Sequence, residues 1–231
     1  MKKEEDIELL QRIANHLIIN SSFLDNLGLF HGKMGIVIFF YHYSRYTRNP
    51  LYEEFAGELL DEIFEEIHDK LPIDFENGYL GIGWGIEYLA EQKFIDGNTN
   101  DILEDMDKKI MERDVRRITD MSLKAGLEGI LHYVLSRIQN NSDIINVFDK
   151  QFTADLEEVA SNIDEIFLSE SLTSLLNNYL LWITFGQSDY SPRNCITGFY
   201  SKEALGNDKV YEWKLGLLDG CAGTGLKCMD L

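Results

Sequence analysis

Apolar residues recur at helical spacing along most of the chain. Between residues 6 and 18 they fall at positions 7, 9, 10, 13, 14, 17 and 18, which is the spacing of one helix face. The stretch from Lys33 to Tyr43 is apolar nearly all round, which indicates a buried helix. From Leu51 to Lys70 one face is apolar and the other is acidic, so this helix is expected to face solvent.

The same alternation of buried and acidic amphipathic segments continues toward the C-terminus. Buried segments are expected at 84–89, 127–138 and 172–185, and acidic amphipathic ones at 101–117 and 155–166. Strict alternation with a period of two residues, the pattern of a half-buried strand, is not convincing anywhere. The sequence therefore predicts an all-α fold, with a long loop at 187–208, where helix signals are few.

Glycine pairs of the form Gly-x-x-Gly stand before the apolar segments. They occur at Gly32–Gly35, Gly126–Gly129 and Gly220–Gly223, with a degenerate copy at 82–86 whose second glycine is Gly85. The second glycines are then 50, 44 and 94 residues apart, and 94 is twice 47. One copy, expected near residue 176, has lost its glycines. A unit of about 47 residues fits two helices and two turns.

This repeat predicts an α/α barrel, with apolar helices inside and acidic helices outside. The glycines would stand where the chain enters each inner helix, either because backbones approach closely there or because the turn needs a positive φ. Several inner-helix N-termini, with their free N–H groups, would then converge on one pocket.

Composition restricts the classes of partner and the compartment. With 21 Lys and Arg against 40 Asp and Glu, the net charge is −19, which argues against binding nucleic acid or an anionic membrane. The acidic N-terminus shows no apolar signal segment, and three cysteines do not form a disulfide framework. We therefore expect a cytoplasmic protein, with residues 1–231 forming a single domain.

The glycine-containing segments at 28–36, 78–89 and 216–226 resemble the lanthionine synthetase C-like (LanC-like) family. The resemblance implies an α/α toroid with Gly-x-x-Gly at the inner-helix starts. It also implies a relation to cyclases that add a cysteine thiol of a precursor peptide to a dehydrated Ser or Thr. The chain has room for about five helical-hairpin repeats, fewer than the family's cyclases, so a homodimer or a partner chain is expected to cover the open toroid.

The family's zinc ligands are not found in this sequence. The cyclases hold zinc with two cysteines and one histidine, and the metal stabilises the thiolate nucleophile. The family's Cys-His-Gly has no equivalent here, because Phe30-His31 and Leu218-Asp219 fill its position in the first and last copies. Cys195 lies half a repeat before Leu218, and Cys221 lies inside its Gly-x-x-Gly pair. We therefore predict no metal site and assign no catalytic residue.

Five residues remain candidates for a pocket at the inner-helix starts: His31, Trp84, Glu128, Asp219 and Cys221. His31 and Asp219 occupy the same position in their copies, and Trp84 and Glu128 lie between glycines. Cys221 would be reactive if a helix N-terminus lowered its pKa. Each also has an ordinary structural interpretation: a hydrogen-bonded histidine, a packed indole, a favourable helix-dipole charge or a small buried thiol.

The leading hypothesis is a non-catalytic or accessory peptide-binding member of the family. One alternative is an active cyclase with non-standard ligands, such as His31 with Cys221 or Asp219. The other is a carbohydrate-active α/α barrel in which Glu128 and Asp219 lie about 5–10 Å apart as acid and base.

Overall fold

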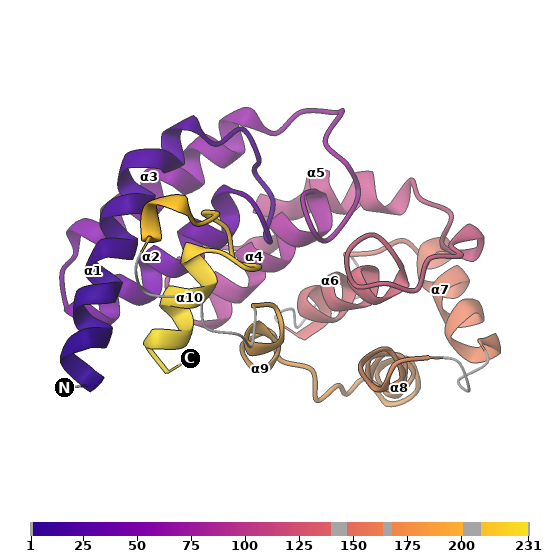
Figure 1. The fold of residues 1–231 in the computed structure, drawn as a ribbon. Helices are drawn as coiled ribbons and strands as arrows, with labels where there is room; N and C mark the ends of the chain where they lie inside the picture. The colour runs from indigo at the N-terminus through magenta and orange to yellow at the C-terminus, as the bar shows by residue number, and fades with distance from the viewer. Residues whose placement is uncertain (1, 140–146, 164–167, 201–208, 231) are drawn as a thin grey trace. The chain divides into compact units, whose positions relative to one another are not determined.

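The computed structural model describes residues 2–139, 147–163, 168–200 and 209–230, which are helical wherever they are regular (Figure 1). The helices are α1 (Lys2–Asn20), α2 (Lys33–Thr47), α3 (Leu51–Glu66), α4 (Tyr79–Glu91), α5 (Thr99–Met111), α6 (Leu127–Gln139), α7 (Lys150–Asn162), α8 (Glu170–Phe185), α9 (Pro192–Cys195) and α10 (Cys221–Cys228). Short 3₁₀ turns are η1 (Ser21–Phe23), η2 (Val115–Arg117), η5 (Ile196–Gly198) and η6 (Val210–Glu212). These residues contain no β-strand, which confirms the all-α prediction.

Several helix boundaries differ from the predicted ones because capping side chains fix them. α7 begins at Lys150, five residues before the predicted start, because the Asp149 carboxylate caps it by accepting a hydrogen bond from the Phe152 amide. The predicted helix over 101–117 is interrupted, since Asp114 caps η2 separately after α5 has ended. Residues 164–166 and 201–208 of the predicted elements lie outside the described residues.

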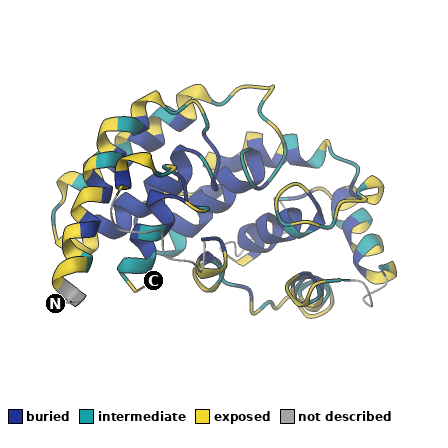
Figure 2. Ribbon diagram, viewed as in Figure 1, coloured by how far each residue is buried: buried dark blue, intermediate teal, exposed yellow. Residues whose placement is uncertain are grey.

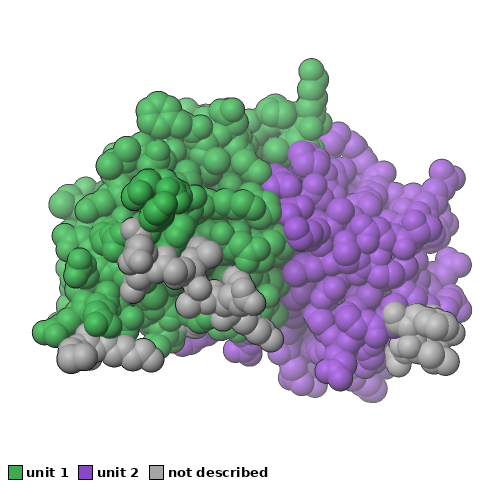
Figure 3. Space-filling view, in the orientation of Figure 1, with its two compact units in different colours: residues 1–71, 195–231 green, residues 72–194 purple. Residues whose placement is uncertain are grey.

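Within the described part, the chain forms two compact units (Figure 3). Unit 1 comprises residues 1–71 and 195–231, and its packing joins α2 to α3, α10 to α2 and α1 to α10. Unit 2 comprises residues 72–194, in which α6 packs against both α4 and α8, with α5 and α7 alongside. The expectation of one domain over 1–231 stays a prediction.

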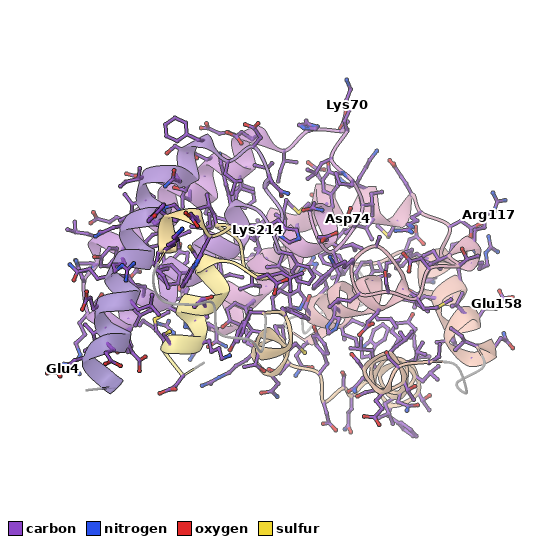
Figure 4. The ribbon with its side chains drawn as sticks, in the orientation of Figure 1. Glu4, Lys70, Asp74, Arg117, Glu158 and Lys214 are labelled. Atoms are coloured by element: carbon purple, nitrogen blue, oxygen red, sulfur yellow. The ribbon has the colours of Figure 1, made fainter. Side chains whose placement is uncertain are left out.

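Burial separates inner helices from outer ones within each unit. Every residue from Lys33 to Ser44 of α2, and from Tyr79 to Leu89 of α4, is buried (Figure 2). The outer helix α3 buries only its apolar stripe, and charged side chains such as Glu158 of α7 project outward (Figure 4). Much of the negative charge thus belongs to a solvated surface. The described residues include no helix both long and apolar enough to cross a membrane.

Four inner helices begin with the same hydrogen-bonded loop, which we call the leading loop. In each case the first helical amide donates to the carbonyl oxygen seven residues earlier. The pairs are Lys33 to Asn26 (2.8 Å), Tyr79 to Pro72 (3.0 Å), Leu127 to Asp120 (2.9 Å) and Cys221 to Lys214 (2.8 Å). α8 differs, because the Ser169 hydroxyl caps it in place of a glycine.

The leading loops correct the predicted position of the second glycine pair. α4 begins after Gly78, so its pair is Gly78–Gly81, four residues before the predicted one. The second glycines are then Gly35, Gly81, Gly129 and Gly223, so that 46 residues separate the first two, 48 the next two and 94 the last two. Trp84 therefore lies in the second turn of α4 and not between the glycines of a turn.

Close approach of the leading loop, and not a positive φ, explains the first glycine of each pair. The φ angles of Gly32, Gly78 and Gly220 are −116°, −123° and −139°, which other residues also adopt. A Cβ at Gly78 would instead overlap the carbonyl oxygen of Pro72, and one at Gly126 would overlap that of Asp120. A positive φ is therefore not what these glycines supply, although Asp219, directly before Gly220, has one of 53°.

A further glycine, at the fifth residue of α4 and of α10, sets how neighbouring inner helices pack. A Cβ at Gly83, in the fifth position of α4, would overlap the ring of Tyr133 in the seventh position of α6. In unit 1, a Cβ at Gly225 would overlap the ring of Phe39. Gly225 is likewise the fifth residue of its helix, α10, and Phe39 the seventh of α2. The contact of α10 with α2 therefore repeats that of α4 with α6.

Candidate functional site

His31 and Asp219 lie in neighbouring turns of unit 1. The Leu218 amide donates to the Phe30 carbonyl oxygen at 2.9 Å, and a Cβ on Gly216 would lie 2.6 Å from the His31 Cα. His31 is half-buried, and Asp219 is exposed with a φ of 53°. The leading loops of α2 and α10 thus bring the equivalent positions of the first and last copies together.

Cys221 is the first residue of α10 and is fully buried. Its thiol lies 4.0 Å from the Val210 carbonyl oxygen, and burial raises its pKa to about 12. A nucleophile needs the opposite shift, since the thiolate is the reactive form. The environment of Cys221 is that of a small buried residue.

Glu128 lies in the first turn of α6, where its carboxylate accepts a hydrogen bond from the Ser171 hydroxyl at 2.6 Å. Ser171 is in the first turn of α8, so this bond connects the starts of two successive inner helices. Glu128 belongs to unit 2 and Asp219 to unit 1. The acid and base pair of the carbohydrate hypothesis therefore stays a prediction.

Trp84 belongs to a buried polar cluster in unit 2 that sequence reasoning did not find. Its indole Nε1 donates to the Tyr190 hydroxyl oxygen at 2.7 Å, and that hydroxyl lies 2.8 Å from Nδ1 of His132. Burial lowers the pKa of His132 to about 3, so the ring is neutral at pH 7 and Nδ1 can accept a hydrogen bond from this hydroxyl. Phe75 packs against both Trp84 and His132.

The corrected helix register would have revealed half of this cluster. Trp84 and His132 are each the sixth residue of their inner helix, so neighbouring helices present them at the same level. Tyr190 carries no such signal, because it lies in the loop between α8 and α9.

Replacing Tyr190 by phenylalanine is expected to lower the free energy of unfolding by about 1–3 kcal/mol. The ring would still fill its space, but the Trp84 donor and the His132 acceptor would lose this partner inside the core. Urea denaturation measures the change. Tyr211→Phe is the matched control, because that ring is 67% exposed and should change stability by less than about 0.5 kcal/mol. Equal effects of the two variants would contradict the prediction.

Stability is expected to fall as the pH is lowered, because His132 is buried in its neutral form. The unfolded chain takes up the proton near pH 6.5 and the folded one only near pH 3, so the unfolded state binds more protons between these values. The contribution of His132 is therefore complete above pH 6.5 and is lost as the pH falls toward 3. Urea titrations across this range should show a shallower slope for His132→Gln than for His68→Gln, whose imidazole is exposed. The same slope in both variants would argue against this assignment.

A second buried cluster in unit 2 joins three helices through Arg137 of α6. Its guanidinium pairs with Glu87 of α4 and, at 2.6 Å, with Asp107 of α5, and the Tyr133 hydroxyl donates to Asp107 at 2.5 Å. Burial raises the pKa of Asp107 even beside this cation. A hollow of about 380 Å³ opens next to Arg137 and Asp107. Because the charges of this cluster already pair with one another, we read it as structural.

The donor set does not fit the zinc site of the family's cyclases. In the described ranges no group of three or more His, Cys, Asp or Glu side chains could hold a metal ion. Cys195, Cys221 and Cys228 form no disulfide, and burial raises the pKa of both Cys221 and Cys228. We derive no chemical step through zinc.

The fold and the sequence together define the class of protein. The helical-hairpin arrangement of inner and outer helices is that of an α/α toroid family, and the sequence model of the lanthionine synthetase C-like protein family matches residues 24–179. The chain belongs to this family. No curated protein and no solved structure matches the chain significantly.

Proposed function

We propose that this chain is a peptide-binding or accessory member of the lanthionine synthetase C-like family that acts without the zinc site of the cyclases. The carrying observation is Cys221, which stands at the start of an inner helix but is fully buried, with its thiol 4.0 Å from the Val210 carbonyl oxygen. The family match supports a relation to peptide modification. Three cysteines that form no disulfide support a cytoplasmic location.

Metal analysis tests the lost zinc site. Protein purified in the presence of zinc and then dialysed is expected to hold well below one zinc per chain. Stoichiometric zinc, reduced by Cys221→Ser but not by Cys195→Ser, would overturn this part of the proposal. It would favour the cyclase alternative.

Peptide selection tests the binding role. The immobilised full chain is expected to enrich related sequences from a phage-displayed library of random peptides, and the enriched peptides should bind in solution. Failure to enrich any sequence would contradict a peptide-binding role.

The neighbouring turns of His31 and Asp219 favour the active-cyclase alternative over the carbohydrate one. That alternative predicts thiol addition to a dehydroalanine-containing peptide, lost in His31→Ala. A homodimer or a partner chain covering the open toroid remains our expectation for assembly, and light scattering that shows a monomer in solution would contradict the homodimer.

A further inference from the structure

A short segment that follows α8 and runs into α9 inserts one aromatic side chain into unit 2. We call residues 187–194 the strap. Tyr190 is 5% exposed, although Gln187 and Asp189 before it and Arg193 after it are exposed. Pro192 is also buried, but it is Tyr190 whose ring reaches the buried polar groups of unit 2, in the way that a bound ligand would.

The site that receives Tyr190 is matched to a phenol. Trp84 offers one hydrogen-bond donor, and His132, in the tautomer protonated at Nε2, offers Nδ1 as one acceptor. Both nitrogen atoms reach the same hydroxyl oxygen, at 2.7 and 2.8 Å. The His132 ring meets the Tyr190 ring edge to face with centroids 5.6 Å apart, while Phe75 packs behind. We call Phe75, Trp84 and His132 the phenol pocket.

The two hydrogen bonds to the buried hydroxyl make this pocket selective. A phenylalanine ring would fill the same volume but leave the Trp84 and His132 groups without this partner. Sites built around a hydroxyl reject the analogue that lacks it, because their buried polar groups then go unpaired. The pocket should therefore discriminate tyrosine from phenylalanine.

The strap is held in place by side-chain contacts near the surface. Glu91 accepts from the Ser191 hydroxyl at 2.6 Å and from the Arg193 amide at 2.9 Å. Asn178 of α8 accepts from the Asp189 amide at 3.0 Å. Opening of the strap breaks these few contacts and those of Tyr190, whereas unfolding of the inner helices breaks the whole core, so local opening of the strap costs less.

We propose that the phenol pocket is a tyrosine-recognition site for a bound peptide, and that Tyr190 of the strap is its internal competitor. The strap occupies the pocket when no peptide is bound, and a peptide that presents tyrosine takes its place as the strap lifts. This inference rests on the proposed peptide-binding function and names the side chain that the peptide must carry.

The first experiment opens the pocket with Tyr190→Ala and adds N-acetyl-tyrosinamide or N-acetyl-phenylalaninamide. We expect the tyrosine probe to raise the melting temperature of the variant and to bind roughly tenfold or more tightly than the phenylalanine probe. Equal binding of both probes, or none, would overturn the proposal. Binding of p-cresol but not of N-acetyl-tyrosinamide would overturn the assignment to a peptide.

The second experiment uses the unaltered chain, so it stands even if Tyr190→Ala does not fold. Trypsin cleavage after Arg193 reports opening of the strap, and cleavage after Lys70 in unit 1 is the internal reference. At about 10 mM, above the millimolar effective concentration of a tethered group, N-acetyl-tyrosinamide should speed cleavage at Arg193 at least about twofold. No change relative to N-acetyl-phenylalaninamide would refute the exchange.

These outcomes separate this inference from the proposed function. Selected peptides that bind equally well after Tyr→Phe replacement in the peptide would keep the binding role and overturn the tyrosine site. An absence of any selected peptide would remove the binding role, while the probe experiments would still decide whether the pocket takes a phenol.

Discussion

Replacement of Arg137 by methionine is expected to lower the free energy of unfolding by about 3–5 kcal/mol. Arg137 is 1% exposed, and its partners Glu87 and Asp107 come from two other helices of unit 2. Without the guanidinium, two buried carboxylates would remain with no cation between them. The loss should therefore exceed that of a typical core substitution. Chemical denaturation monitored by circular dichroism measures it.

Two further variants separate the charge effect from the loss of packing. Adding Glu87→Gln to the Arg137→Met chain should restore part of the stability, because it removes one uncompensated charge. The deficit should also shrink as the pH falls, since protonation neutralises the stranded carboxylates. Arg117→Met is the control, because Arg117 is exposed and pairs with Asp114 at the surface, so its loss should scarcely change the melting temperature. A deficit that is the same at every pH would show that packing alone is responsible.

The second large effect is expected at Gly78. A Cβ there would overlap the carbonyl oxygen of Pro72, which is backbone and cannot rotate away. The same carbonyl accepts the first amide of α4, so Gly78→Ala must displace the hydrogen bond that closes the leading loop. We expect a loss of about 3 kcal/mol, the upper end of the usual cost of overpacking. Thermal and urea denaturation should agree on it.

Gly57→Ala provides the matched control for this glycine. Gly57 lies inside α3, and a Cβ on it would meet no atom within 4 Å. The substitution should stabilise the helix by about 0.5–1 kcal/mol, because alanine loses less conformational freedom on folding. Opposite signs for the two variants are the expected result. A neutral Gly78→Ala would show that the loop relaxes and that its close approach is not required.

Helical periodicity predicted most of the fold because inner and outer helices differ so strongly in composition. The starts of α2 and α6 and the extent of α8 were predicted to within two residues. The start of α7 was missed because Asp149, its cap, precedes the apolar pattern. The register of α4 was wrong because the helix carries glycines at 81, 83 and 85, and only the leading loop identifies the pair that begins at Gly78.

The predicted pocket residues were chosen by their positions relative to the glycine pairs, but those positions do not determine their surroundings. Cys221 and Trp84 are both buried, and Glu128 pairs with a serine of the next inner helix. The cluster around Tyr190 could not be predicted, since a loop residue far along the chain shows no periodicity that would place it against His132.

The pairing of α10 with α2 has a consequence for the order in which the protein folds. Unit 2 is one continuous stretch, residues 72–194, so it can form as soon as that stretch has been synthesised. Unit 1 cannot be complete at that stage, because Phe39 of α2 packs against Gly225 of α10, nearly the whole chain later. Contacts of such long sequence separation form slowly, as closing a long loop must precede them. During synthesis, the apolar face of α2 must therefore wait for α10, which is made only after the whole of unit 2.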